Sequence, residues 1–433
     1  MPSRVPDELI RVEDKLYSAQ QLAKIHPGGP LFVKAFAGRD SSQAFLSYHR
    51  KPFPHNRAKE AFYAVDKSVD YSEKDNQDFL ELCELINKVL PKGKSFAPWH
   101  YFVKIGILTL VTVILEFHIH YTASYKWHLT ALLGFLFALI GLNIQHDANH
   151  GAISLNPNVN RFLGTFQNWI GGSAISWIHQ HVVQHHIHTN DVRLDPDIAL
   201  EFYVRLNPTH PLLKFQLFQY FYFFILIAFY GVLKVVLSIE DVLSWKHYTP
   251  MSRLLKSYQS FEVLGSAVFM LRWIALPIIY TPDGRWWISL VNILPMAMVA
   301  GYYLSFFFTI SHNFRGVHMH EDTRRETNQK NSFLYNQVVS SSNVGGSWLC
   351  FLNGGLNYQI EHHLFPRINH THYPTIAPHV KKFCDERKIP YVHFTTIDAN
   401  LRACIKHLMD MGESEMPNSV VMEKAATKMP IVS

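Results

Sequence analysis

Charged side chains are scarce in this sequence. Asp, Glu, Lys and Arg make up 17% of its 433 residues, whereas soluble domains carry about 25%. The 40 basic residues exceed the 34 acidic ones by only six, and no run rich in Lys and Arg stands out. These numbers argue against nucleic-acid binding. They point instead to long apolar segments.

Cysteine is equally scarce. The four cysteines are Cys83, Cys350, Cys384 and Cys404, and no two of them form a CxxC pair. This spacing argues against a disulfide framework or a zinc ribbon and favours a reducing compartment. The N-terminus lacks the apolar stretch of a cleavable signal peptide, so we expect internal segments to direct membrane insertion. Histidine is the exception to this scarcity, with 26 residues that cluster.

Four apolar segments approach the roughly 20 residues that a helix needs to cross a membrane. They are residues 101–121, 127–145, 263–280 and 286–310. Short turns join the first two and the last two, so the sequence predicts two hairpins. A fifth apolar segment, residues 215–237, is broken by Gln216, Gln219, Gly231 and Lys234. We expect this segment to lie in the membrane interface or to re-enter the membrane.

Histidines gather in three sets just outside the predicted spans. The sets are His146 with His150, then His181, His185 and His186, and finally Gln359 with His362 and His363. Residues four apart share a helical face, so two imidazoles with this spacing can hold one metal ion. Neutral imidazole suits iron, copper and zinc. Seven histidines exceed what one ion can use, so the sequence predicts two metal ions.

The three sets must lie on one side of the membrane if they build one site. Two spans precede the first set, none separates the first from the second, and the hairpin 263–310 separates the second from the third. Four spans satisfy this condition and place both termini on the same side. Nearly all basic residues outside the spans lie on that side, which predicts that it is cytoplasmic.

The motifs HDxxH, HxxxHH and QxxHH, in this order around paired spans, resemble those of the membrane fatty acid desaturases. Gln359 at the start of the third motif resembles the front-end branch, which adds a double bond between an existing one and the carboxyl end of an acyl chain. The stretches QHDANHGA (145–152), HQHVVQHHIHTN (179–190) and GGLNYQIEHHLFP (354–366) are most similar to those of the Δ5 type. The resemblance covers roughly residues 10–410.

This resemblance implies a di-iron centre held by the histidines of the three motifs, with Gln359 in the catalytic set. It also implies one further histidine ligand after the last span, and His312 has that position. Asp147, Asp195 and Asp197 either orient ligand imidazoles or cap helices; both interpretations stay open.

The N-terminal region carries a second pattern. His26-Pro27-Gly28-Gly29 is followed by Gly38-Arg39-Asp40, by Ala44-Phe45 and by His49. This order resembles cytochrome b5. The resemblance implies haem b with His26 and His49 as axial ligands. Two histidine ligands leave no open position on the iron, so such a haem carries electrons and does not bind dioxygen.

The expected fold is therefore mostly α-helical: four transmembrane helices with a cytoplasmic cap that carries the histidines, and a small α+β cytochrome b5-like domain. The expected boundaries are 8–90 for the b5-like domain, 95–410 for the desaturase domain and 411–433 for a flexible C-terminal tail. The acyl chain is expected in an apolar tunnel between spans and cap, with Trp169, Trp177, Phe307 and Trp348 as candidate lining residues.

The resemblance implies a multi-pass enzyme of the endoplasmic reticulum that acts on a C18–C20 polyunsaturated acyl chain, as acyl-CoA or phospholipid. Dioxygen is the oxidant, and electrons come from NADH through cytochrome b5 reductase and the haem. Δ5 is favoured, but Δ4, Δ6 and Δ8 enzymes, a sphingoid-base desaturase, a hydroxylase and an acetylenase share the motifs. A non-catalytic membrane haem carrier would instead place histidines within the spans.

Overall fold

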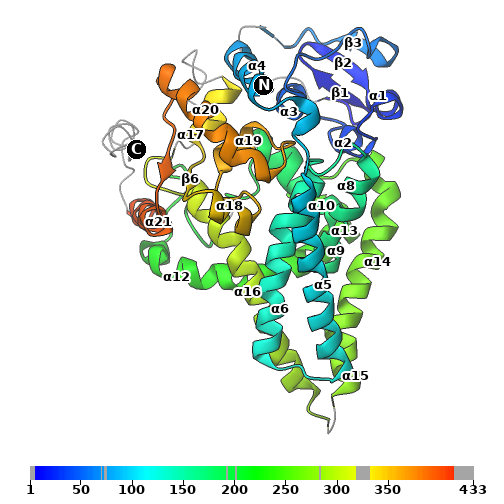
Figure 1. The fold of residues 1–433 in the computed structure, drawn as a ribbon, viewed down its shortest axis with the longest axis vertical. Helices are drawn as coiled ribbons and strands as arrows, with labels where there is room; N and C mark the ends of the chain where they lie inside the picture. The colour runs from blue at the N-terminus through cyan, green and yellow to red at the C-terminus, as the bar shows by residue number, and fades with distance from the viewer. Residues whose placement is uncertain are drawn as a thin grey trace.

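The computed structural model describes residues 5–69, 71–72, 76–191, 194–199, 202–281, 284–317 and 332–413. The described part is mostly helical, as predicted, with a small sheet-containing unit at one end and long helices at the other (Figure 1). The last helix, α21 (Ile397–Gly412), passes the expected domain boundary at residue 410. The rest of the expected tail, from residue 414, lies outside the described residues.

The N-terminal unit is built on a three-stranded antiparallel sheet in the order β1-β2-β3. Its elements are β1 (Leu9–Val12), β2 (Lys15–Ser18), β3 (Phe62–Val65), α1 (Ala19–Ile25), α2 (Leu31–Ala35) and α3 (Ser42–His49). The guanidinium of Arg11 on β1 donates to Asp40 at 3.2 Å and to Asp66 at 3.1 Å. These paired charges fasten the sheet to the segment that leads into α3, which carries His49.

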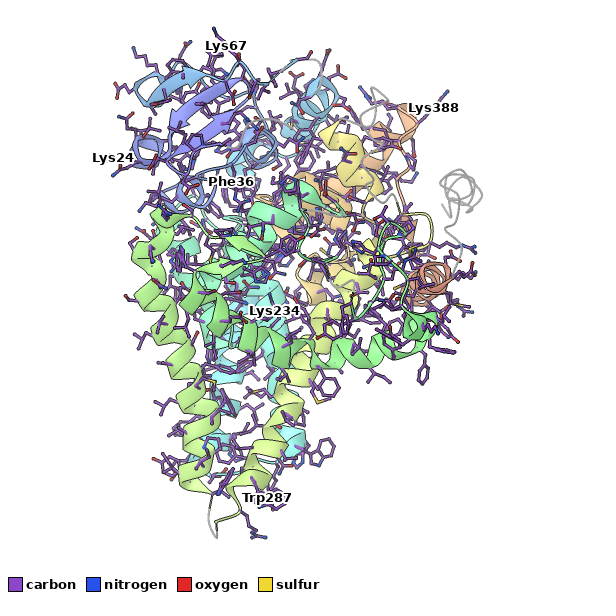
Figure 2. The ribbon with its side chains drawn as sticks, turned by 180° about the vertical axis from the view of Figure 1, so that it is seen from behind. Lys24, Phe36, Lys67, Lys234, Trp287 and Lys388 are labelled. Carbon is purple, nitrogen blue, oxygen red and sulfur yellow. The ribbon has the colours of Figure 1, made fainter. Side chains whose placement is uncertain are left out.

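Long helices form a bundle that points away from this unit (Figure 1). They are α5 (Trp99–Tyr121), α6 (Trp127–Ile140), α14 (Gln259–Met270) with its continuation α15 (Leu276–Tyr280), and α16 (Trp286–His312). Each contains or overlaps one predicted span. Lys24, Lys67 and Lys388 lie near the opposite end of the molecule from Trp287 (Figure 2). This distribution fits a bundle that crosses a membrane and a polar end that stays outside.

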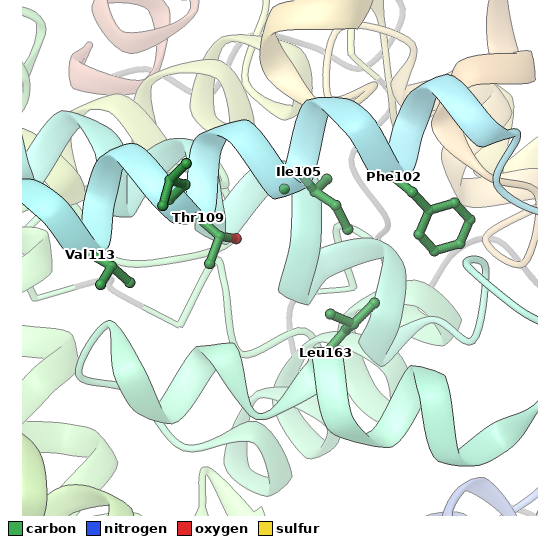
Figure 3. Close-up of a pocket in the computed structure, with 7 residues that line it drawn as sticks. Phe102, Ile105, Thr109, Val113 and Leu163 are labelled. Atoms are coloured by element: carbon green, nitrogen blue, oxygen red, sulfur yellow. The ribbon is translucent and has the colours of Figure 1, made fainter.

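An open apolar groove of about 450 Å³ lies between α5 and α8 (Pro157–Gly164). Its lining side chains point toward one another across the two helices (Figure 3). The lining residues are Phe102, Ile105, Gly106, Thr109, Leu110, Val113 and Leu163. The groove is open and apolar and lies on the surface of the bundle.

The interrupted segment 215–237 forms α12 (Gln219–Leu226) and α13 (Tyr230–Ser244). Its polar residues face the cap: the amide of Gln219 donates to the carbonyl oxygen of Leu408 at 2.9 Å, and Lys234 contacts Gln180. The opposite face exposes an apolar stripe of Phe218, Phe221, Ile225, Phe229, Leu233 and Val236. Figure 1 shows α12 running across the direction of α5, α6 and α16.

By length and composition alone, five helices of the described part could cross a membrane. They are Lys92–Tyr121, Trp127–Asn149, Lys214–Ser244, Arg253–Tyr280 and Trp286–His312. Four of these helices correspond to the predicted spans, and the fifth, Lys214–Ser244, contains the interrupted segment. The polar residues of this segment are too few to bring its mean hydropathy below that of a membrane span. An amphipathic helix with this division of faces also suits the plane of a membrane interface.

The cap covers the end of the bundle that faces the N-terminal unit. Its main helices are α17 (Phe333–Val339), α18 (Ser347–Asn353), α19 (Gln359–Leu364), α20 (Tyr373–Glu386) and α21, and a short parallel pair joins β6 (Asn343–Val344) to β7 (His393–Phe394). Helix α4 (Gln77–Val89), inside the expected 8–90 domain, buries Phe79, Leu82 and Ile86 in the core of this cap. The two expected domains therefore share packing.

Candidate metal centre

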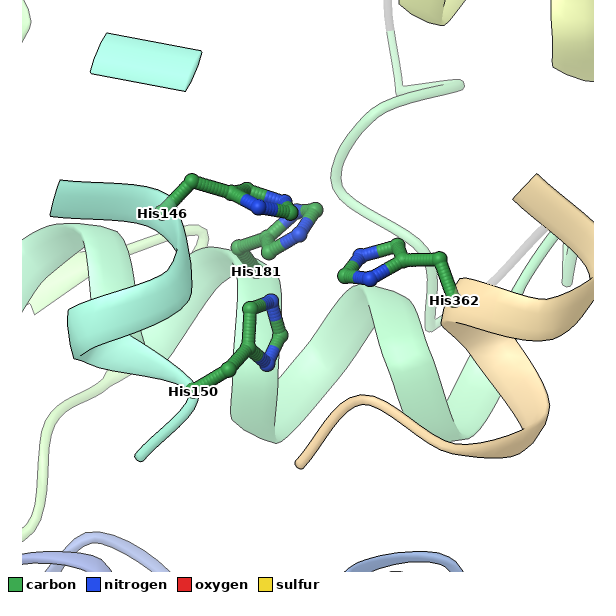
Figure 4. A group of neighbouring side chains, drawn as sticks. All are labelled: His146, His150, His181 and His362. Atoms are coloured by element: carbon green, nitrogen blue, oxygen red, sulfur yellow. The ribbon is translucent and has the colours of Figure 1, made fainter. Parts of the chain in front are cut away.

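The three histidine sets meet inside the cap and form two groups of ligand atoms that consist of histidines alone. The first group is His146, His150, His181 and His362, and the second is His185, His312 and His363. Within each group the ligand atoms lie within 4.8 Å of one another, and every member is buried. Figure 4 shows the four imidazoles of the first group converging from three different segments.

The first set follows α6 without a break in the helix. A π-helical turn, Gly141–Gln145, leads directly into α7 (His146–Asn149). The rings of His146 and His150 have centroids 4.8 Å apart, so the i, i+4 spacing brings both to the same group. A widened turn of this kind is frequent at functional sites, because it shifts the side chains that follow it.

The second set is divided between the groups. The π-helical segment Ile178–His185 carries His181 to the first group and His185 to the second. These two histidines also form a possible set of ligand atoms with Asp197, so their i, i+4 spacing still allows one shared ion. The ring of His185 packs 5.0 Å from that of His312 at the end of α16 and 5.0 Å from that of His363 on α19. These two helices bring His312 and His363 next to His185.

His186 lies between the groups. Its ring centroid is 4.6 Å from that of His362 in the first group and 4.4 Å from that of His363 in the second. Its Nε2 lies 3.1 Å from Nε2 of His181, and its Nδ1 is buried without a hydrogen-bond partner. His186 thus touches both groups.

The double glycine before the third motif makes the close approach of α19 possible. Gly354 and Gly355 have φ of +59° and +82°, a region that favours glycine. A Cβ on Gly355 would lie 2.5 Å from Cβ of His370, and one on Gly354 would clash with the backbone of Leu142. Gly354 therefore lets the loop before α19 approach the π-helical turn that leads to the first set, and Gly355 lets the same loop pack against His370.

The hydrogen bonds around the imidazoles leave metal-binding atoms free. In five histidines Nδ1 is hydrogen-bonded to an oxygen atom. The pairs are His150 with Tyr48, His185 with Asp195, His312 with Ser340, His362 with Tyr373 and His363 with Gln337. Nε2 of all five is buried without a partner. Such an arrangement fits metal ligands, which usually donate their other N–H to an oxygen.

Burial keeps most of these imidazoles in the neutral form that binds metals. Burial, followed by the neighbouring imidazoles, lowers the pKa well below the usual value of about 6.5 for His150, His181, His186, His362 and His363. The pKa of His185 is raised instead: burial alone would lower it, but the carboxylates of Asp195 and Asp197 outweigh that effect.

The predicted carboxylates have different roles. Asp195 accepts from Nδ1 of His185 at 3.1 Å, and Asp197 lies 3.3 Å from the same atom. Asp147 does not contact a ligand imidazole; it binds Nδ1 of His370 at 2.6 Å and the amide of Asn369 at 2.9 Å. The interpretation that Asp147 orients a ligand imidazole is therefore wrong. The side chain of Asp147 points away from the ligand face and ties the first motif to the turn after the third.

We expect Asp195→Asn to lower the metal content of the centre by about 10- to 100-fold, the usual effect of removing such a partner. The amide keeps the shape of the side chain but removes the charge that holds His185. Metal per chain, measured by mass spectrometry on the purified protein, gives the effect. Asp398→Asn is the matched control, since Asp398 pairs with Arg402 on the exposed face of α21. Wild-type metal content in Asp195→Asn would contradict a role for this carboxylate.

Trp177 lies at the same centre, and Gln359 begins the helix that carries two of its histidines. Gln359 begins α19 one turn before His362 and His363, and both of its amide atoms are buried without a hydrogen-bond partner. Trp177 has its ring centroid 4.4 Å from that of His181. Phe307 is buried, whereas Trp348 is 74% exposed. The tunnel that these aromatic residues were expected to line stays a prediction.

Comparison with known proteins explains why these histidines converge. Residues 124–395 match the family described as fatty acid desaturase. The chain belongs to the fatty acid desaturase family. It is 41% identical to an acyl-lipid (7-3)-desaturase from Rebecca salina, over 94% of this chain and 91% of the relative. It is 39% identical to an enzyme of the same name from Diacronema lutheri, over 94% and 90%.

A more distant relative is the probable Delta(5) fatty acid desaturase C from Dictyostelium discoideum, 28% identical over 94% of this chain and 92% of the relative. Desaturases are oxidoreductases that act on lipid acyl chains with dioxygen and depend on two irons. The two histidine groups of this desaturase could bind metal, and its apolar helices mark it as a membrane protein.

The desaturase has a second pair of facing histidines in its N-terminal unit. The rings of His26 and His49 have centroids 5.8 Å apart with planes at 77°. Nδ1 of His26 is hydrogen-bonded to the carbonyl oxygen of Gly29 at 2.8 Å, and Nδ1 of His49 to that of Phe45 at 3.0 Å. Both Nε2 atoms are thus left available for an iron. A Cβ on Gly28 would lie 2.9 Å from the His26 ring, so glycine makes room for it.

These two histidines line a cavity of about 290 Å³. It lies between the N-terminal unit and the desaturase domain, because residues from both contribute to its wall. The lining residues are His26, Pro27, Gly28, Ser47, Tyr48, His49, Arg50, Lys51, Lys92, Gly93, Ser95, Phe96, Leu155, Arg367 and Ile368.

Tyr48 connects this cavity to the metal centre. It precedes His49 on α3, and its hydroxyl lies 2.7 Å from Nδ1 of His150. Sequence reasoning missed this contact, since 102 residues separate the two side chains and no local pattern marks it. The N-terminal unit therefore supplies one outer partner of the first histidine group.

Proposed function

We propose that this protein is a front-end acyl-lipid desaturase that adds a cis double bond on the carboxyl side of an existing one. The observation that carries the proposal is the convergence of eight buried imidazoles into two adjoining groups, His186 included. Gln359 at the start of the third motif supports the front-end assignment. Membership of the desaturase family supports the reaction class.

The two groups are proposed to hold one iron each. His146, His150, His181 and His362 would hold the first, and His185, His312 and His363 the second, with His186 between them. Bound iron supplies the oxidation of an unactivated C–H bond by dioxygen, which side-chain acids and bases cannot perform. The oxygen atoms on Nδ1 fix each imidazole, and burial of the site excludes bulk water.

Haem b is proposed to bind between His26 and His49 and to pass electrons from NADH, through a separate cytochrome b5 reductase, to the irons. The free Nε2 atoms and the cavity between the domains support this assignment. A donor and an acceptor in one chain meet at a high effective concentration. The contact between Tyr48 and His150 places the proposed haem ligand His49 next to a residue that touches the metal centre.

Four membrane crossings and cytoplasmic termini, in the endoplasmic reticulum, are proposed for the topology. The division of faces in α12 and α13 supports an interfacial position for residues 214–244. Epitope tags at either terminus should be digested by protease added to sealed microsomes. Protection of one tag but not the other would contradict an even number of crossings.

Two positions of the new double bond are candidates. The names of the relatives at 41% and 39% identity favour a (7-3) outcome, whereas similarity around the motifs and more distant relatives favour Δ5. We propose the (7-3) outcome first. The length of the acyl tunnel sets this choice, since it decides which carbon reaches the histidine groups.

Fatty-acid profiling tests the proposal. The chain would be expressed in yeast, fed C18, C20 and C22 polyunsaturated acids separately, and compared with His362→Ala by gas chromatography–mass spectrometry. A new double bond at Δ4 of an acid already unsaturated at Δ7 supports the (7-3) outcome, and one at Δ5 supports the second candidate. If a chain loaded with iron and haem converts none of these acids, the acyl-lipid proposal is wrong, and sphingoid bases become the next substrates.

A further inference from the structure

The cavity beside His26 and His49 has an unusual charge. Its wall includes Arg50, Lys51, Lys92 and Arg367, and no Asp or Glu among the described residues lines it. Lys51 and Lys92 are exposed, whereas Arg50 is buried and Arg367 half-buried, and charges in such positions are normally paired. Arg50 donates to the carbonyl oxygen of Leu90 at 3.1 Å, so it is fixed within the protein. Arg367 remains to be explained.

Arg367 is the strongest indication. It lies in the turn that follows α19, and its guanidinium stacks over the ring of Phe96 at 5.5 Å. Within the part of the chain that the structure describes, this guanidinium has neither a hydrogen bond nor an ion pair. Burial lowers the pKa of Arg367, because a guanidinium that is partly removed from water loses solvation of its charge. A cation in that position requires an acceptor that the cavity itself does not provide.

We propose that Arg367, with Lys51 and Lys92 at the rim, binds the propionate carboxylates of the haem. The inference rests on the haem assignment above and adds which residues anchor that group and how it is oriented. The iron ligands His26 and His49 come from the N-terminal unit, whereas Lys92 and Arg367 come from outside the expected 8–90 domain. The haem is therefore clamped between two parts of the chain.

This orientation has a consequence for the metal centre. Arg367 lies four residues beyond His363, in the turn that follows α19, and Tyr48, which also lines the cavity, contacts His150. Haem binding would hold both walls of the cavity together and so keep the N-terminal unit next to the two histidine groups. Propionate carboxylates would neutralise these cations and so offset the repulsion between them.

Haem release from the purified full-length protein tests the proposal. Transfer of haem to an excess of apomyoglobin, followed at the Soret band, gives the release rate without any measurement of desaturation. We expect Arg367→Gln to release haem about 10- to 100-fold faster, as the loss of one charge-assisted hydrogen bond implies. Arg367→Lys keeps the charge without the planar fork, so its rate should fall between the two. The haem reduction potential should also fall in Arg367→Gln, because a nearby positive charge favours the reduced form.

Arg387→Gln is the matched control. Arg387 pairs with Glu81 at 2.6 Å, away from the cavity, so its release rate should equal that of the wild type. Haem dimethyl ester provides a second test that needs no substitution, since it lacks the carboxylate charges. The wild type should hold the ester more weakly than haem, whereas Arg367→Gln should hold the two about equally. Esterification of the ligand and substitution of the residue remove the same contact, so their effects should not add.

Three outcomes decide between the proposals. An unchanged release rate in Arg367→Gln, or equal retention of haem and ester by the wild type, would overturn the clamp while leaving the haem assignment intact. A wild-type protein without a Soret band would overturn the haem assignment itself, and the clamp with it. Rates ordered as expected in both tests support the propionate contact.

Discussion

Replacing His186 with alanine will abolish desaturation and reduce the iron content of the protein at both positions. His186 touches the first group through His181 and His362 and the second through His363. Loss of its ring opens a space between the two groups and removes a ligand that either iron can use. We expect activity to fall by about 100-fold or more, because loss of even an outer partner of a ligand costs about 10- to 100-fold. Iron per chain and product formation would be measured together.

His188→Ala is the control for this change, because His188 lies two residues further on the same segment and is a member of neither group. His312→Ala offers a contrast, since His312 belongs to the second group alone. It should remove iron from that group and leave the first one loaded. If His186→Ala keeps two irons per chain, the position of His186 between the groups has no role in binding.

Replacing His49 with alanine will remove the haem and stop desaturation that is driven by NADH, while both irons stay bound. The proposed axial bond from His49 is lost, and the remaining ligand, His26, cannot hold a six-coordinate haem alone. The absorbance spectrum of the purified protein reports the haem, and mass spectrometry reports the iron. Activity should fall to the level of the background in the expression host.

His55→Ala is the control within the same unit. His55 contacts Tyr17 at 2.6 Å and Glu13 at 2.7 Å and does not line the cavity, so the haem should remain. Full NADH-driven activity in His49→Ala would show that electrons enter by another route. Loss of iron together with haem would instead show that His49 stabilises the whole fold, which would remove the support for a separate electron-entry site.

Much of the architecture could be predicted from local patterns. Apolar runs near 20 residues predict helices, because a membrane-spanning backbone must satisfy its hydrogen bonds internally. Residues 99–121 and 286–312 form long helices accordingly. The polar interruptions of residues 215–237 predicted a segment with one polar face. Gln219 and Lys234 lie on that face, where Gln219 donates to the carbonyl oxygen of Leu408 and Lys234 contacts Gln180.

The arrangement inside the site could not be predicted in the same way. Spacing suggests that His181 and His185 share an ion, and they do form a possible set with Asp197. Each also belongs to a separate histidine group, because α19 supplies His362 to one group and His363 to the other. The acidic residue of the first motif, Asp147, was expected as a possible partner of a ligand and binds His370 instead. A motif defines which side chains are close along the helix but not which neighbours surround them.

The sequence by itself determined the class of protein. Helix periodicity, the lengths of apolar runs and the order of the three histidine motifs depend on residues that are close together in the sequence. They can therefore be predicted from the spacing of residues along the chain. Only the tertiary structure decided how the ligands divide, that Tyr48 contacts His150, and that Arg367 faces the cavity of His26 and His49. Those contacts join residues separated by a hundred positions or more, and they arise from packing of distant segments, which leaves no pattern along the chain.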